Sequence, residues 1–263
     1  SRIEADAVLD LKAGTLSGSF GSEALELADL PSDVGLVGTV AVRQGRVSGK
    51  LEDPTVTAEI ESGELFLGNI TAMGTRGSLR ANSKELDLQK MLVFLSPSAN
   101  RTEADFEAAK LDDPMTVPQG AVLASGKLAW KDQSGTIQAA WQGLDLEALI
   151  RPDERVQVAG QTSGKANVVL VAAKPTQGQG EVNLDGVTVN GSSLGAGSVA
   201  VNGTGGKWTA QGGLAQVGEE VRLLELANLE WDPETNAARG KVLASNLEAN
   251  SLLSMLRPIT KDQ

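Results

Sequence analysis

The sequence predicts an all-β protein: an elongated, curled sheet in the form of a half-pipe, with an apolar concave face. Three observations predict it. Apolar side chains recur at every second position over most of the chain, which is the period of a strand with one wet face. Thirty glycines punctuate these runs, and glycine at that density marks turns and strand ends. Only 3% of the 263 residues are aromatic, so Ala, Val and Leu dominate the apolar content, which suits thin repeated layers.

The alternation is already present at the first residues and continues in runs of about five to nine residues, a usual strand length. Each run ends at Gly, Asn, Asp or Pro, and its other face is polar, as in antiparallel sheets with one solvated face. The clearest apolar sets are Val40 and Val42; Val56, Ala58 and Ile60; Ile137, Ala139 and Trp141; Ala166, Val168 and Leu170; Val182 and Leu184; Val187 and Val189; and Val199 and Val201.

Helical patterns are scarce. The strongest covers 246–256, where Asn246 is a suitable N-cap and Pro258 would end the helix. Shorter candidates cover 144–150, which Pro152 follows, and 103–110.

The leucine-rich segments also indicate a weak internal repeat. Similar openings occur at 25–33, 144–154 and 247–258, and after each of the first two come a Gly-punctuated strand, a turn and another strand. We therefore expect a first repeat segment at 1–143, a second at 144–246, and a connector helix at 247–263 that opens a third. Because the pattern is under way from the start, we expect a segment of a longer protein.

Composition excludes several function classes. The formal net charge of −11 argues against nucleic-acid binding, which needs clustered Lys and Arg, and no polybasic membrane-binding patch occurs. The acidity is most simply explained by solubility. Cysteine is absent, which excludes disulfides, thiolate metal sites and Cys nucleophiles. No signal peptide or membrane-spanning apolar run is visible.

Segments that partly match catalytic or ligand-binding motifs are more simply explained as turns or solvated charges. GSSLG at 191–195 formally matches a nucleophile elbow around Ser193, but the chain has no His, and strand-like residues follow where a helix is required. A Ser–Lys dyad stays conceivable. GTGGKW at 203–208 fails the phosphate-loop spacing, and the pairs Asp112–Asp113 and Glu219–Glu220 lack the spacing of a calcium loop. We therefore expect a structural or binding protein without catalytic residues, metal or cofactor.

The apolar strand faces are the remaining candidate for function. They have two interpretations: an ordinary sandwich core, or an open groove whose apolar face is available to an acyl chain. The continuity of these faces, and the lack of large aromatic side chains to fill a closed core, favour the groove.

The stretch 35–70 resembles the recurrent unit of the TamB and AsmA-like proteins of diderm bacteria. The matching pieces are G-x-V-x-V from Gly38, the turn at Gly45, V-S-G from Val47, L-x-D-P from Leu51 and S-G-x-L from Ser62. The stretches 77–93 and 182–191 continue the pattern more loosely. The resemblance covers most of the chain. It consists of a similar residue pattern and spacing, and it does not include a strict signature motif. The low aromatic content and the absence of His depart from the familiar members and leave the subfamily open.

The resemblance implies a periplasmic segment of a protein anchored in the inner membrane, which moves phospholipid to the outer membrane and supports outer-membrane assembly beside a barrel partner. Membrane contact would come from regions outside this segment. A plastid relative shares the style, so the plastid intermembrane space is the alternative location. The implied groove would bind phospholipid acyl chains, and the inward phase of each strand is an assumption, because a one-residue slip would reverse it. The expected lining residues are Val40, Val42, Val56, Ala58, Ile60, Val168, Leu170, Val182 and Leu184.

Two other functions stay open. One is a structural β-solenoid or adhesin-like stalk with a closed core and no lipid cargo. The other is an enzyme on a β-helix, such as a polysaccharide lyase, which would need a catalytic constellation that the sequence does not offer. A β-helix also predicts coils of roughly 20–25 residues, and no such period is present.

Overall fold

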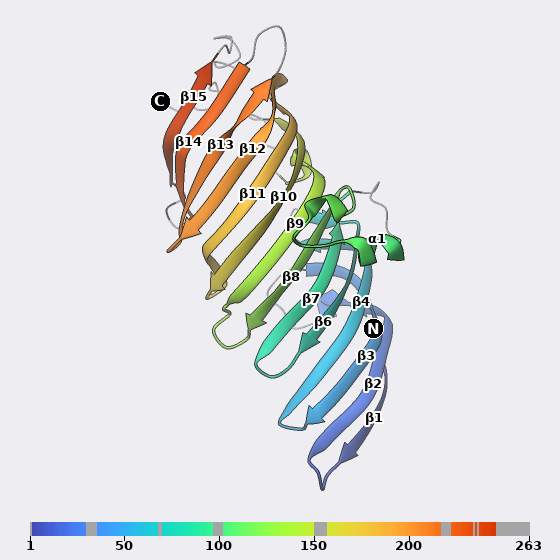
Figure 1. Ribbon diagram of the computed structural model, residues 1–263. Helices are drawn as coiled ribbons and strands as arrows, with labels where there is room; N and C mark the ends of the chain where they lie inside the picture. Colours follow the sequence, from blue (N-terminus) through green and yellow to red (C-terminus); the bar gives the residue numbers. More distant parts are fainter. Residues whose placement is uncertain are drawn as a thin grey trace.

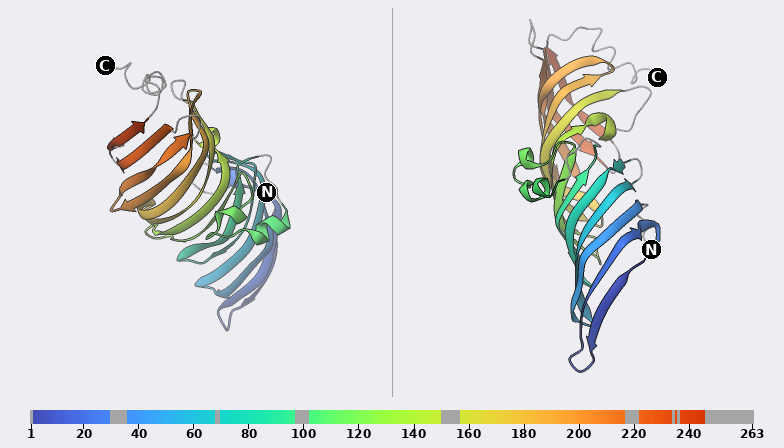
Figure 2. Two further views of the ribbon diagram at one scale, coloured as in Figure 1. Left: turned by 45° about the horizontal axis from the view of Figure 1, so that its top comes forward. Right: turned by 90° about the vertical axis from the view of Figure 1, so that its right-hand side faces the viewer.

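The computed structural model describes residues 2–29, 36–67, 70–96, 102–149, 157–216, 222–233, 235 and 237–245. They form a single 15-stranded antiparallel sheet that does not close on itself, and Figures 1 and 2 show it as an elongated, curled structure. The prediction of an all-β, curled sheet is therefore confirmed. The sheet continues without a break across the expected segment boundary at residue 143, because β9 pairs with both β8 and β10.

The strands follow one another as a meander, and each pairs with its neighbours in sequence, except that β4 pairs with both the short β5 and β6. The strands are β1 (Glu4–Asp10), β2 (Thr15–Glu26), β3 (Leu36–Lys50), β4 (Asp53–Leu67), β5 (Ile70–Ala72), β6 (Gly74–Ala81), β7 (Glu85–Phe94), β8 (Ala121–Ala129), β9 (Gly135–Asp145), β10 (Val158–Val171), β11 (Lys174–Val189), β12 (Ser192–Thr204), β13 (Lys207–Gln216), β14 (Arg222–Asp232) and β15 (Ala237–Ser245).

One long edge of the sheet, here called the turn rim, carries the short hairpin turns that follow β1, β3, β6, β8, β10, β12 and β14. Successive turns bond to one another. The Leu51 N–H donates to the Gly14 carbonyl at 2.9 Å, the Trp130 N–H to the Lys84 carbonyl at 2.9 Å, and the Ala173 N–H to the Gln133 carbonyl at 2.9 Å. These bonds join three pairs of neighbouring hairpins, in addition to the hydrogen bonds between the strands.

The opposite edge, the connector rim, carries the longer links. They include η1 (Leu27–Asp29), α1 (Glu103–Ala108), η2 (Pro114–Thr116) and α2 (Leu146–Leu149). The helix predicted at 103–110 forms as α1, with a capping box between Thr102 and Asp105. The helix predicted at 144–150 is shorter than expected, because Leu144 and Asp145 complete β9. The helix and third segment predicted at 246–263 lie outside the described residues.

The α1 segment covers the convex side of the sheet (Figure 2). Phe106, Leu111 and Val117 pack there on a buried cluster that includes Leu92 and Leu123. The guanidinium of Arg76 lies 5.3 Å and the ammonium of Lys90 4.7 Å from the Phe106 ring centroid. We call this side the outer face and the opposite, concave side the inner face.

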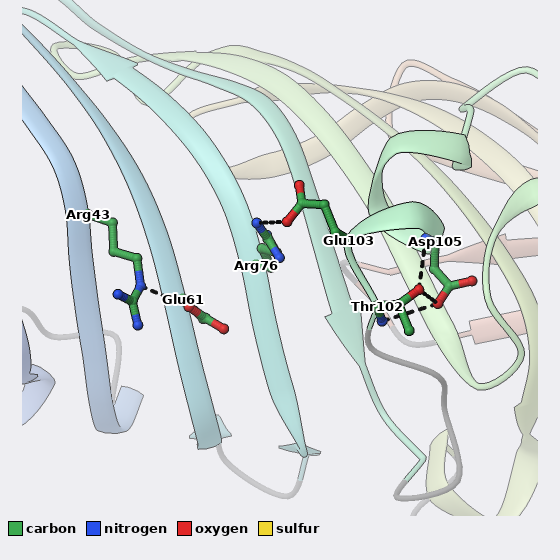
Figure 3. A network of polar contacts seen from close by, with 6 residues as sticks. All are labelled: Arg43, Glu61, Arg76, Thr102, Glu103 and Asp105. Atoms are coloured by element: carbon green, nitrogen blue, oxygen red, sulfur yellow. Dashed lines mark hydrogen bonds and ion pairs between the residues drawn. The ribbon is translucent and has the colours of Figure 1, made fainter.

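Figure 3 shows how charged residues hold this segment: Arg76 of β6 pairs with Glu103 of α1, next to the pair Arg43–Glu61. The sequence predicted a solvated outer face, and the apolar patch beneath α1 is an exception to that expectation. The patch does not reach solvent because the α1 segment covers it.

Glycine on the inner face permits the close packing of adjacent strands. A Cβ added at Gly77 would lie 2.5 Å from the Lys90 carbonyl oxygen, and one at Gly126 would lie 2.4 Å from that of Thr136. Real Cβ atoms do not approach so closely, so any larger residue would force these strands apart. The high glycine content therefore serves the curvature of the sheet as well as its turns.

Candidate functional site

Apolar residues line the inner face in rows that run across the strands. Directly opposed residues of an antiparallel pair lie on the same face, so the register defines each row. Every member of the first three rows is apolar or Gly. The first row is Val42, Ile60, Gly77, Met91, Ala124, Ala139, Ala166, Gly180, Val201, Ala210 and Leu229.

Two further rows lie between the first row and the turn rim. The second row is Ala58, Leu79, Leu88, Gly126, Ile137, Val168, Gly178, Gly203, Trp208, Trp231 and Ala238. The third row, nearest the turn rim, is Ala7, Gly18, Val47, Val56, Ala81, Leu86, Leu128, Gly135, Leu170 and Pro175.

All nine residues expected to line a groove lie on the inner face. Val42 and Ile60 belong to the first row, Ala58 and Val168 to the second, and Val56 and Leu170 to the third. Val40, Val182 and Leu184 lie on the same face nearer the connector rim. The structure thus brings the two sets, which are more than 100 residues apart in the chain, onto one continuous surface.

Parts of this surface are open. Ile137 is 36% and Trp231 44% exposed, although both belong to the second row in the middle of the apolar face. Most other members of the three rows are half-buried, since their neighbours along and across the strands shield their sides. No second layer of the described residues packs over these rows, so they are unlike a sandwich core.

Two buried polar side chains on the inner face are hydrogen-bonded within the protein. The Ser22 hydroxyl donates to the Arg2 carbonyl at 2.7 Å, and Thr162 Oγ1 accepts the indole N–H of Trp141 at 3.3 Å. Both Ser22 and Thr162 are buried. The indole of Trp208 fills the space above Gly203 and Gly178, where an added Cβ would lie 2.6 and 2.9 Å from ring atoms. The indole N–H of Trp208 is buried without a hydrogen-bond partner among the described residues.

Charged side chains instead gather on the outer face. The pairs Arg43–Glu61 at 2.9 Å, Lys127–Asp87 at 3.7 Å and Lys165–Glu181 at 3.8 Å join neighbouring strands there. They are mostly exposed, so each contributes little to stability. They do, however, distinguish the two faces of the sheet: the outer face carries charged side chains, and the inner face carries apolar ones.

Two carboxyl groups with perturbed titration lie on the turn rim. Hydrogen bonds from the Ser83 hydroxyl and N–H lower the pKa of Asp53, and bonds from Ser134 lower that of Asp132 in the same way. Both groups join or stabilise turns, and both lie away from the inner face.

Two short clusters cover the inner face along the connector rim. Leu27 of η1 packs against Val40, Leu65 and Ala72, and the half-buried Ile60 and Val93 adjoin them. Leu146 of α2 packs with Val187, Leu194 and Leu214, and Leu184 adjoins them. The apolar surface left open is therefore the part nearer the turn rim. Sequence periodicity did not indicate these clusters, because Leu27 and Leu146 lie outside strands.

The catalytic alternatives find no support among the described residues. Ser193 is exposed within β12, so a strand continues where an elbow needs a helix. Asp113 caps η2 by accepting the Met115 N–H at 3.1 Å, and Glu219–Glu220 lies outside the described residues. In the described part of the chain no three His, Cys, Asp or Glu residues converge as a metal site, and no helix is long and apolar enough to cross a membrane.

Comparison of the chain with family models, curated proteins and solved structures gave no match.

Proposed function

We propose that the inner face is a hydrophobic groove that binds phospholipid acyl chains, and that the chain is a segment of a periplasm-spanning lipid-transport protein. The observation that carries the proposal is the three uninterrupted apolar rows on an open concave face. The resemblance of 35–70 to the TamB and AsmA-like repeat supports the same conclusion. In that context the parent protein would be anchored in the inner membrane, act with an outer-membrane barrel partner and support outer-membrane biogenesis.

The dimensions suit an acyl chain. The first row crosses eleven strands, and at about 4.8 Å between neighbouring strands it extends over about 48 Å. An acyl chain covers half of a bilayer core, or about 15 Å. Burial yields about 0.8 kcal/mol per methylene, so ten methylenes on the groove would contribute about 8 kcal/mol before the costs of binding. Area alone is sufficient, and no specific motif is needed.

The second candidate is a structural stalk with a closed core. It predicts coils that close and fill their interior, whereas the described strands form an open sheet with exposed Ile137 and Trp231 in its apolar face. These observations favour the groove over the stalk.

The test is site-specific crosslinking with phosphatidylcholine vesicles and a photoreactive amino acid at Val168 of the inner face. Gln179, an exposed outer-face residue on the neighbouring strand β11, is the matched control. We expect a lipid adduct at Val168 and none at Gln179. Mass spectrometry of the unmodified purified chain should also detect co-purified phospholipid. Failure of both measurements, with the fold intact by circular dichroism, would refute the proposed function.

A further inference from the structure

The two leucine-rich connectors that mark the weak sequence repeat occupy equivalent places in the sheet. η1 directly follows β2 and α2 directly follows β9, and both lie on the connector rim. Each turns one leucine onto the inner face: Leu27 onto the cluster around Val40, and Leu146 onto the cluster around Leu214. The repeat thus places the same contact at two positions along the sheet.

The contact of α2 is specific to one side chain. Leu146 is 9% exposed and joins the cluster, whereas Leu149, one turn later, is 40% exposed. A four-residue helix has no stability of its own in water. The packing of Leu146 on apolar strand residues is therefore what holds α2 over the inner face.

We propose that Leu27 and Leu146 act as caps that close the groove along the connector rim and confine bound acyl chains to the three apolar rows nearer the turn rim. This inference rests on the proposed function. A leucine side chain and an acyl chain would bury the same apolar area on the same strands. The leucine is part of the polypeptide, so it competes at a high effective concentration and excludes the lipid.

The caps separate the expected lining residues into two groups. Val168 and Leu170 lie in the open rows and would contact lipid. Val40 is only 7% exposed in the Leu27 cluster, and Leu184 adjoins the Leu146 cluster, so both would be shielded. The two caps are thus specificity-determining residues, because they set the width of the apolar surface that a ligand can reach.

The test compares a photoreactive residue at Leu184 with one at Val168 in the full chain, using phosphatidylcholine vesicles. We expect a strong lipid adduct at Val168 and a severalfold weaker one at Leu184. Leu146→Ala should raise the Leu184 adduct toward the Val168 level, and the matched variant Leu149→Ala should leave it unchanged.

The adduct yields at Leu184 and Val168 distinguish failure of the capping inference from failure of the groove. Equal adducts at Leu184 and Val168 in the parent chain would overturn the capping inference and leave the groove intact. Absence of an adduct at both positions would refute the groove itself. Carbene footprinting of the unsubstituted chain guards against misfolding of the variants: lipid should protect the peptide that contains Val168 and Leu170 and leave labelling around Leu214 unchanged.

Discussion

Trp208 of β13 lies directly opposite Trp231 of β14 in the second row of the inner face. The Trp208 indole covers two glycines of the neighbouring strands, while Trp231 stays 44% exposed. Because tryptophan fluoresces, these two rings can report on what the second row contacts.

Brominated phospholipid should quench the fluorescence of Trp231 and spare that of Trp130. Trp130 is 45% exposed, almost the same fraction, but lies in the β8–β9 turn on the turn rim, where its indole N–H donates to the Asn82 carbonyl at 2.9 Å. Bromine quenches only at close contact. In two variants that each retain one of these tryptophans, the fluorescent side chains would differ in location and not in exposure. Equal quenching of the two would contradict a lipid site confined to the inner face.

The alternation along each strand could be predicted from sequence, because successive side chains point to opposite faces, whereas the choice of the inward face was an assumption. The runs around Val56 and Val168 lie on the inner face. The position of α1 could not be predicted, since its apolar residues contact Leu92 and Leu123, which alternate out of phase with the inner face. β-Bulges such as that between Arg43 and Arg46 also shift the phase, and no local pattern specifies them.

Gly126→Val should destabilise the chain by about 1–3 kcal/mol, the usual cost of overpacking. Its Cβ would lie 2.4 Å from the Thr136 carbonyl oxygen, so β8 and β9 would have to separate. Urea unfolding followed by circular dichroism measures the effect. Gly63→Ala is the control, because a Cβ there meets nothing within 4 Å and the backbone is not in the left-handed region. Similar losses for both variants would show that close strand approach is not the cause.

Phe106→Ala should reduce stability by less than about 3–5 kcal/mol, the range for a fully buried ring, because Phe106 is only partly buried. The change removes both cation–π contacts and uncovers the Leu92 cluster on the outer face. Glu107→Ala is the control on the same helix, since its side chain is exposed and Lys90 bonds to its backbone carbonyl. Lipid binding by folded Phe106→Ala should equal that of the parent, because α1 lies on the face opposite the groove.

The Asp53–Ser83 link should make the turn rim sensitive to acid. The pKa of Asp53 is lowered in the folded state, so its contribution to stability is complete above the unfolded value of about 3.9 and is lost as the pH falls through the lower folded pKa. Asp53→Asn should therefore reduce the slope of stability against pH below pH 4 in urea titrations, by a small amount because the group is exposed. An unchanged slope would show that the bond does not persist in solution.

A charge on the inner face should weaken lipid binding severalfold, whereas the same charge one residue later should not. Ile137 and Gln138 are adjacent on β9 and both are exposed, but Ile137 lies in the second row and Gln138 on the outer face. Ile137→Lys would place an ammonium group on the path of an acyl chain, where its desolvation opposes binding. Because Ile137 is already 36% exposed, the substitution should leave the fold intact. We expect co-purified phospholipid, measured by mass spectrometry, to fall severalfold in Ile137→Lys and to stay at the parental level in Gln138→Lys. If both variants retained their lipid, the inner face would not be the binding surface, and the open apolar rows would need another occupant.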